Sequence, residues 1–122
     1  MIERALVQTH LVFGFGLLVM VAAALVIAAP AVLRGRTPAP LYAALQRAVT
    51  VFILAQVALG VVLFISGKRP QTNLHLVYAL AAILVLPVAR SLAHRRQATA
   101  PLYQLGGTVL LLGVIFRLAT TG

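Results

Sequence analysis

Residues 6–29 read LVQTHLVFGFGLLVMVAAALVIAA, and this stretch decides the fold. Only Gln8, Thr9 and His10 interrupt its apolar character, and all three stand near its start. About 20 consecutive apolar residues cross the hydrocarbon core of a bilayer as an α-helix. The stretch is therefore predicted to span a membrane.

Three further apolar runs follow this one, at residues 41–65, 73–94 and 102–119. The segments between the runs carry proline, glycine and basic residues, which are typical of turns. A chain of 122 residues forms at most one ordinary domain. We expect an all-α integral membrane protein, with residues 1–122 forming a single transmembrane domain. Its four-helix bundle would have helices at about 6–29, 41–65, 73–94 and 102–119.

The composition agrees with a membrane protein and excludes nucleic acid as a partner. Apolar residues make up 62% of the chain and charged residues 9%, against roughly 45–50% and about 25% in soluble domains. The formal charge is +9, with ten Lys and Arg residues against Glu3. In a soluble protein this excess would suggest nucleic-acid binding. Here the basic residues lie mostly between apolar runs, where they orient membrane segments, so the expected partner is the lipid bilayer.

The sequence also limits the chemistry that the protein can perform. It has no cysteine, which excludes disulfides, iron–sulfur clusters and thiolate metal sites. With one acidic residue, paired-carboxylate catalysis and a carboxylate proton relay are excluded as well. We therefore predict no catalytic residues, and expect an electron carrier or structural subunit before an enzyme.

The basic residues predict the orientation of the helices. The first and third connections, with the helix ends beside them, hold the denser set: Arg34, Arg36, Arg47, Arg90, Arg95 and Arg96. Connections rich in Lys and Arg stay on the cytoplasmic side. We therefore expect both termini to face outward, in a multi-pass protein of a bacterial or archaeal inner membrane.

Two short strings occur twice in the chain. His-Leu-Val-Phe begins at His10 and His-Leu-Val-Tyr begins at His75, while Ala-Pro-Leu-Tyr begins at Ala39 and again at Ala100. The strings keep the same order on the same expected elements, which indicates an internal two-helix repeat. The two halves would be related by an axis along the membrane normal.

The repeat places polar residues of all four helices in the outer half of the bundle. His10 and His75 stand near the starts of parallel helices, within a few residues of the same membrane face. Aligning the return helices on Ala-Pro-Leu-Tyr pairs Gln56 with Arg117. These four side chains form the candidate site.

Each histidine is followed by an aromatic residue at i+3 and a small residue at i+4. They are Phe13 and Gly14 after His10, and Tyr78 and Ala79 after His75. Positions i, i+3 and i+4 lie on one helix face. A macrocycle held by a helical histidine needs a small neighbour one turn along, and His is a common axial ligand of haem iron. Since four-helix bundles commonly hold cofactors between facing helices, we expect His10 and His75 to bind one haem b.

Other interpretations of the same residues stay open. A histidine near the membrane interface often bonds headgroups, water or a carbonyl of a neighbouring helix. Each histidine could instead hold a separate pigment such as a bacteriochlorophyll. Arg117 either reaches the outer headgroups or neutralises a haem propionate, and Gln56 is expected to be an interhelical hydrogen-bond partner.

The chain resembles one half of the haem A synthase family over roughly residues 4–90. Its first helix has His10 near the outer end with Gly14 one turn on, Gln56-Val-Ala-Leu-Gly60 is similar to that family's Gln-x-x-Leu-Gly string, and Leu74-His75-Leu follows a short outer loop. The resemblance implies that His10 and His75 are the axial pair of a four-helix, haem-binding half. The acidic residue one turn before the first histidine, the His-Arg pair and the outer-loop cysteines of that family are missing here. The resemblance is therefore to the half that holds haem without modifying it.

The sequence predicts a b-type cytochrome-like membrane protein. It would transfer electrons, or serve as a haem-bearing subunit of a respiratory or photosynthetic complex, beside other membrane subunits or as a homodimer. Two alternatives remain: a cofactor-free accessory subunit of a membrane complex, and a haem-modifying enzyme like haem A synthase.

Overall fold

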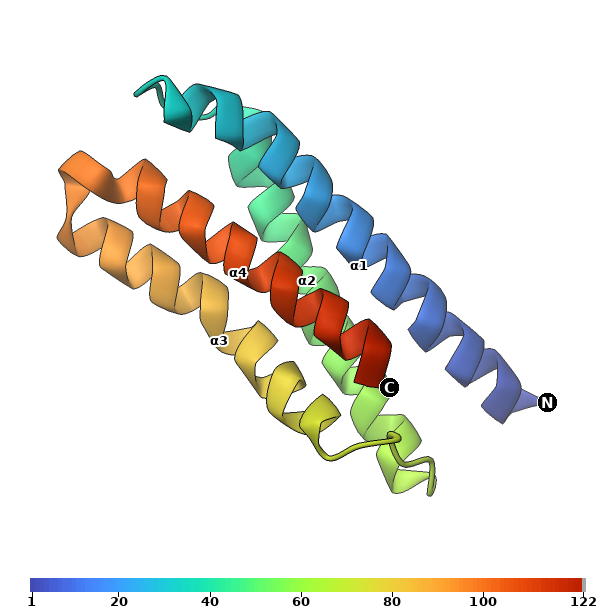
Figure 1. Ribbon diagram of the computed structural model, residues 1–122. Coiled ribbons are helices and arrows are strands. Elements are labelled where there is room, and N and C mark those ends of the chain that lie inside the picture. Colours follow the sequence, from blue (N-terminus) through green and yellow to red (C-terminus); the bar gives the residue numbers. More distant parts are fainter. Residues whose placement is uncertain (122) are drawn as a thin grey trace.

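The computed structural model is a bundle of four long helices (Figure 1). They are α1 (Ile2–Leu33), α2 (Pro40–Ile65), α3 (Leu74–Arg95) and α4 (Ala100–Thr121), with a short 3-10 helix, η1 (Gln97–Thr99), before α4. The structure describes residues 1–121, apart from the side chain of Glu3. No strand occurs in this described part of the chain, and the predicted all-α bundle is confirmed.

All four helices are long and apolar enough to cross a membrane. Their outward faces carry large apolar side chains, among them Phe15 at 69%, Val26 at 74% and Phe116 at 57% exposure. A bundle surrounded by water would place polar residues on these faces. In lipid, a helix also satisfies its own backbone hydrogen bonds. The chain is therefore a multi-pass membrane protein whose outer faces contact the bilayer.

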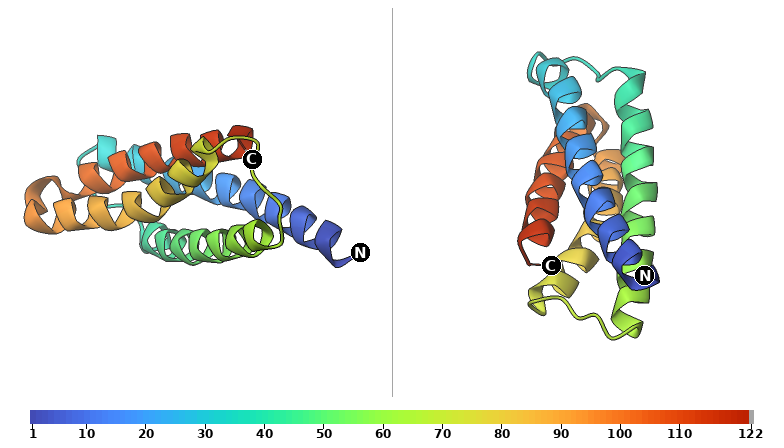
Figure 2. Two further views of the ribbon diagram at one scale, coloured as in Figure 1. Left: turned by 90° about the horizontal axis from the view of Figure 1, so that it is seen from below. Right: turned by 90° about the vertical axis from the view of Figure 1, so that its right-hand side faces the viewer.

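The helices run alternately up and down, so the chain connections gather at two ends of the bundle (Figure 2). One end holds Met1, Thr121 and the connection 66–73, and is called the terminal end below. The other holds the connections 34–39 and 96–99, and is called the basic end.

Helix α1 packs against α2 and α4, whereas α3 packs mainly against α4 and more loosely against α2. Over the described residues, the backbones of α1 and α3 do not approach one another. Helices α1 and α3 therefore occupy opposite corners of the bundle.

Glycine ends both α1 and α2. Gly35 and Gly67 have φ angles of 68° and 86°, a left-handed conformation that glycine adopts without steric cost. The Gly35 N–H donates to Val32 O (2.9 Å) and the Arg36 N–H donates to Ala31 O (2.8 Å). This pair of bonds is a Schellman motif, which satisfies the last carbonyls of the helix. The same pattern recurs at Gly67, so each connection begins at a defined residue.

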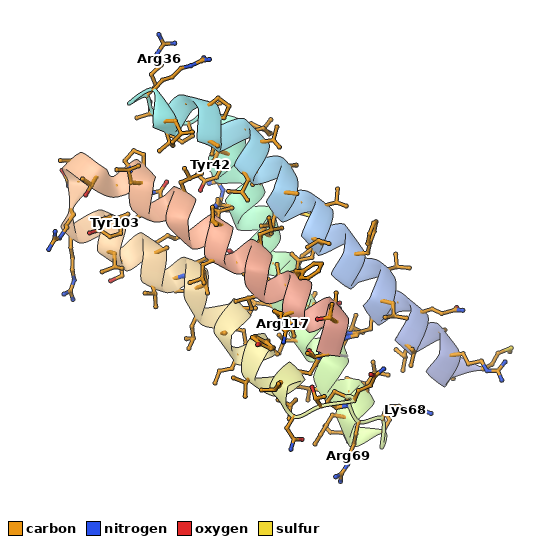
Figure 3. All side chains as sticks on the ribbon, viewed as in Figure 1. Arg36, Tyr42, Lys68, Arg69, Tyr103 and Arg117 are labelled. Carbon is orange, nitrogen blue, oxygen red and sulfur yellow. The ribbon has the colours of Figure 1, made fainter. Side chains whose placement is uncertain are left out.

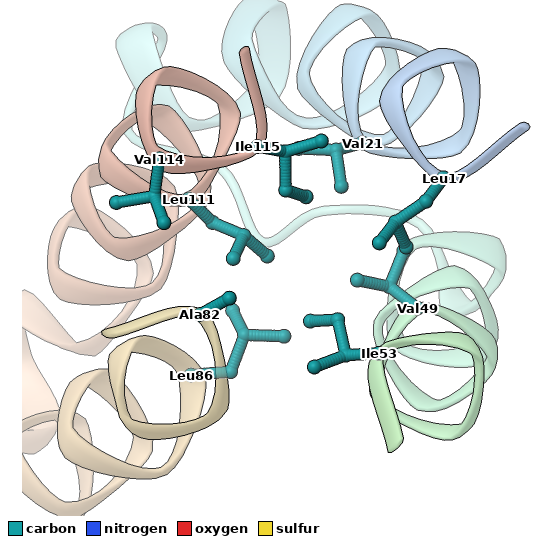
Figure 4. Close-up of a cluster of buried hydrophobic side chains, with 9 residues drawn as sticks. All are labelled: Leu17, Val21, Val49, Ile53, Ala82, Leu86, Leu111, Val114 and Ile115. Atoms are coloured by element: carbon teal, nitrogen blue, oxygen red, sulfur yellow. The ribbon is translucent and has the colours of Figure 1, made fainter. Parts of the chain in front are cut away.

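The core lies midway along the bundle and draws on all four helices (Figure 4). Its buried side chains are Leu17, Val21, Val49, Ile53, Ala82, Leu86, Leu111, Val114 and Ile115. Nearer the basic end, Gly107 of α4 lies directly against Ala89 of α3, where a Cβ on the glycine would collide with the Ala89 side chain. This close approach explains why α3 and α4 form the most tightly packed pair.

The observed helix ends differ from the expected ones mainly at α1. Helices α2 and α3 begin and end within one residue of the expected positions, and α4 is two residues longer at each end. Helix α1 is four residues longer at each end and continues through Pro30. Membrane helices tolerate an internal proline because neighbouring groups compensate for its missing N–H.

Candidate functional site at the terminal end

The two histidines face each other across the bundle near the terminal end. His10 lies on α1 and His75 in the first turn of α3, and each is partly buried. Their ring centroids are 6.3 Å apart, with an angle of 53° between the ring planes. Helices α1 and α3 occupy opposite corners of the bundle, and their backbones do not approach each other. The two histidine side chains therefore meet across the space between these helices. The repeat predicts that His10 and His75 lie at the same depth in the membrane, and the distance between their rings agrees with this prediction.

Each histidine keeps a buried ring nitrogen without a hydrogen bond. The Nδ1 atoms of His10 and His75 are both shielded and have no partner among the described residues. A buried polar atom left unpaired costs about 1–3 kcal/mol. Two unpaired nitrogen atoms in facing rings indicate a candidate site for a ligand that binds both imidazoles.

Gln56 of α2 connects its helix to the backbone beside His10. Its Nε2 donates to the His10 carbonyl oxygen at 2.7 Å. This is the interhelical hydrogen bond that the sequence favours for Gln56. A Cβ added at Gly14 would lie 3.1 Å from the same Nε2. Gly14 therefore leaves room for the Gln56 amide, rather than only for a macrocycle as its place after His10 suggests.

A second glycine, Gly60, is the small residue that faces the His10 ring. A Cβ added at Gly60 would lie 3.5 Å from Cε1 of His10. In the sequence, Gly60 is named only as the end of a family-like string, and it is not included in the predicted site. Gly60 follows Gln56 by four residues, which is about one helical turn. This spacing is the feature of the sequence that links Gly60 to Gln56.

The aromatic residues of the site have partners within the bundle. Phe13 stacks on Phe52 of α2, with centroids 5.5 Å apart and an interplanar angle of 27°. On the other side, the guanidinium of Arg117 lies 5.8 Å from the centre of the Tyr78 ring, a cation–π distance. Ala79 follows Tyr78 on α3 and is partly buried.

The two halves of the repeat use Gln56 and Arg117 in corresponding ways. Gln56 reaches from α2 to the His10 turn of α1, and Arg117 reaches from α4 to the turn of α3 that follows His75. Each second helix thus contacts the histidine-bearing helix of its own half. Figure 3 shows Arg117 at the same end of the bundle as Lys68 and Arg69. This end therefore combines an imidazole pair with four basic side chains, since Arg4 in the first turn of α1 lies there as well.

The spacing of the rings fits a single metal held from two sides. A metal–imidazole bond is about 2 Å long and the ring nitrogen lies about 1 Å from the centroid, so opposed ligands place their centroids roughly 6 Å apart. The observed 6.3 Å is close to that separation, and it also lies in the range of about 4.5–7 Å at which two rings contact each other directly. Within the described chain, the pair belongs to no cluster of three or more His, Cys, Asp or Glu residues. A haem brings further ligands for its iron, so His10 and His75 would be the residues that hold it.

The sequence interpretation missed a second polar cluster, near the basic end. The Gln46 Nε2 donates to Tyr42 Oη (2.7 Å) and to Thr108 Oγ1 (2.6 Å), and the Tyr42 and Thr108 hydroxyls are bonded at 2.8 Å. All three residues are buried, and Gln46 Oε1 has no partner among the described residues. The signal was available in the repeat, because Tyr42 ends the first Ala-Pro-Leu-Tyr string and Gln46 follows it by one helical turn.

Comparison of the chain with protein-family models, curated proteins and solved structures gives no match. The likeness to haem A synthase therefore rests on the short motifs alone.

Proposed function

We propose that the protein binds one b-type haem through His10 and His75, and acts in electron transfer or as a haem-bearing subunit of a respiratory or photosynthetic membrane complex. The observation that carries the proposal is the 6.3 Å separation of the two rings across the bundle. The unpaired Nδ1 atoms add support, since binding iron through Nδ1 would give these two buried atoms a partner.

A single shared metal explains the ring distance better than two separate pigments. Two stacked macrocycles between the histidines would add about 3.5 Å, the contact distance of carbon atoms, to the roughly 6 Å that one metal requires. The observed distance leaves no room for that second layer. One haem is therefore favoured over a pair of bacteriochlorophylls.

The protein's own residues would hold the site and tune its charge. Gln56 fixes the turn of α1 that carries His10, and Gly60 keeps space beside the ring. Arg117, held against Tyr78, is placed to neutralise a carboxylate near the terminal end. Bound haem would supply a one-electron exchange between ferric and ferrous iron, and two axial histidines would leave no open iron position for ligand activation.

The haem content of histidine variants tests the assignment. His10→Ala and His75→Ala each remove one of two axial bonds, so haem content should fall, and the double variant should purify without haem. His94→Ala is the matched control, because His94 is exposed near the basic end of the bundle. The measurement is the ratio of haem to protein after purification.

Two outcomes would contradict the proposal. A folded double variant that retains a six-coordinate haem would show that other residues bind the iron. Absence of haem from the unmutated, folded protein would favour the alternative function, a cofactor-free accessory subunit. Haem modification is less favoured, since a catalytic iron needs an open position.

A further inference from the structure

A pocket of about 310 Å³ opens between α2 and α3, near the basic end and away from the histidine pair. Its apolar lining includes Leu86 and Ala89 of α3, which are buried. Its polar wall includes Gln46, and two arginines line it from opposite helices, Arg47 of α2 and Arg90 of α3. The pocket follows from the looser packing of α2 against α3.

The two arginines bring positive charge that no acidic side chain balances. Glu3 is the chain's one acidic residue, and residue 3 lies in the first turn of α1, at the terminal end. The Arg90 guanidinium donates to the Gln46 carbonyl oxygen (3.4 Å) and the Thr50 hydroxyl (3.3 Å), both neutral acceptors at long distances. Since arginine has five N–H donors, most of its capacity for hydrogen bonding remains.

Both arginine side chains are exposed on the bundle surface, at a depth where a charge benefits from a bound anion. Arg47 lies seven residues inside the start of α2 and Arg90 five residues before the end of α3, about 10 Å and 8 Å along the helix axis. A helix of 26 residues is roughly 39 Å long, so it extends only about 5 Å beyond each side of a 30 Å hydrocarbon core. The arginine backbones therefore lie below the headgroup level, where a charge is costly unless it is paired or reaches the interface.

We propose that this pocket binds an anionic phospholipid, with Arg47 and Arg90 holding its phosphate. The opening between α2 and α3 faces the bilayer, so a lipid can place its headgroup on the arginines and its glycerol and acyl carbons against Leu86 and Ala89. Basic pockets between membrane helices are suited to phosphate headgroups, and arginine matches phosphate with paired N–H donors. The site is independent of the haem proposal, because the histidine pair lies at the opposite end.

Lipid retention by the purified protein tests the proposal. The protein in a neutral detergent is titrated with phosphatidylglycerol or with phosphatidylcholine, and bound lipid is counted by native mass spectrometry. We expect phosphatidylglycerol to be retained about tenfold more strongly, and Arg47→Gln/Arg90→Gln to abolish this preference. Arg95→Gln/Arg96→Gln is the matched control, with the same charge removed at the same end but outside the pocket.

The other outcomes of this experiment would each overturn the lipid site. Equal retention of the two lipids, or equal loss in both double variants, would overturn the proposal in favour of a diffuse basic surface. Displacement of phosphatidylglycerol by an equal concentration of inorganic phosphate would contradict a lipid site and indicate a free-phosphate site. If the double variant does not fold, Arg47→Gln alone should weaken phosphatidylglycerol retention, and unchanged retention would then overturn the proposal.

Discussion

The amide of Gln56 is the residue-scale feature on which the His10 side of the site depends. Its one observed bond, to the His10 carbonyl, joins α2 to α1 close to the ring, and its Oε1 is buried without a partner among the described residues. Glycines at positions 14 and 60 make this arrangement possible, since one faces the amide and the other faces the ring. Small changes at these two positions should therefore disturb the site before they disturb the fold.

Gly14→Ala should weaken the site. The added Cβ would lie 3.1 Å from Gln56 Nε2, so the amide must shift by a few tenths of an ångström, which should weaken its bond to His10. Thermal stability and haem content of the purified protein should both be slightly lower than in the Gly16→Ala variant, which makes the same exchange in the same helix without this contact. Gly16→Ala is the matched control, because a Cβ there meets nothing within 4 Å. Equal effects of the two substitutions would argue against a positioning role for Gln56.

Gly60→Leu should lower haem content while leaving membrane insertion intact. A leucine at this position would occupy the space beside the His10 ring and displace it, whereas leucine itself favours lipid. The control is Ala58→Leu, an exposed position on the same helix. Full haem content with an unchanged absorption spectrum in Gly60→Leu would mean that His10 does not need its observed position.

At the scale of whole helices, the contact between α3 and α4 anchors the second half of the repeat. Gly107 allows the backbone of α4 to approach Ala89 more closely than any side chain would permit. The neighbouring Gly106 is exposed and meets nothing within 4 Å. Gly107 is therefore tightly packed against α3, whereas the neighbouring Gly106 has free space around it.

Gly107→Ala should destabilise the protein and Gly106→Ala should not. Overfilling a packed contact typically costs about 1–3 kcal/mol, whereas alanine at a free helical position gains up to about 1 kcal/mol over glycine. Thermal unfolding followed by the loss of helical circular dichroism would separate the two. A Gly107→Ala protein at least as stable as Gly106→Ala would contradict the close packing of α3 on α4.

The helices could be predicted from the sequence because a spanning segment needs only length and apolar character. The repeat likewise predicts that Gln56 and Arg117 stand in corresponding positions, in the same half of the bundle as the two histidines. The partners of Gly14 and Gly60 could not be predicted, since they depend on the rotation of α2 against α1. For the same reason, the hydrogen bonds among Tyr42, Gln46 and Thr108 appear only once α2 and α4 are placed in space.

On the scale of the whole molecule, the two ends of the bundle carry different functional groups. The histidine pair lies near the terminal end, while the arginine pocket and two basic connections lie at the other end. Connections rich in arginine stay on the cytoplasmic side. The histidine pair should therefore lie near the outer surface of the membrane.

Cysteine labelling tests this orientation, and the chain suits it because it has no cysteine of its own. Gln71→Cys, in the connection between α2 and α3, should react with a membrane-impermeant maleimide on intact cells. Thr37→Cys, in the connection between α1 and α2, should react only after permeabilisation. The reverse pattern would place the histidine pair on the cytoplasmic side.

The absorption spectrum of the purified, unmutated protein, oxidised and then reduced, tests the central claim most directly. Two axial histidines on one iron predict a low-spin b-type spectrum in both states, and no spectral change when carbon monoxide is added to the reduced protein, because the iron has no open position. A folded protein without haem, or a haem that binds carbon monoxide readily, would contradict the pairing of His10 and His75 on one iron.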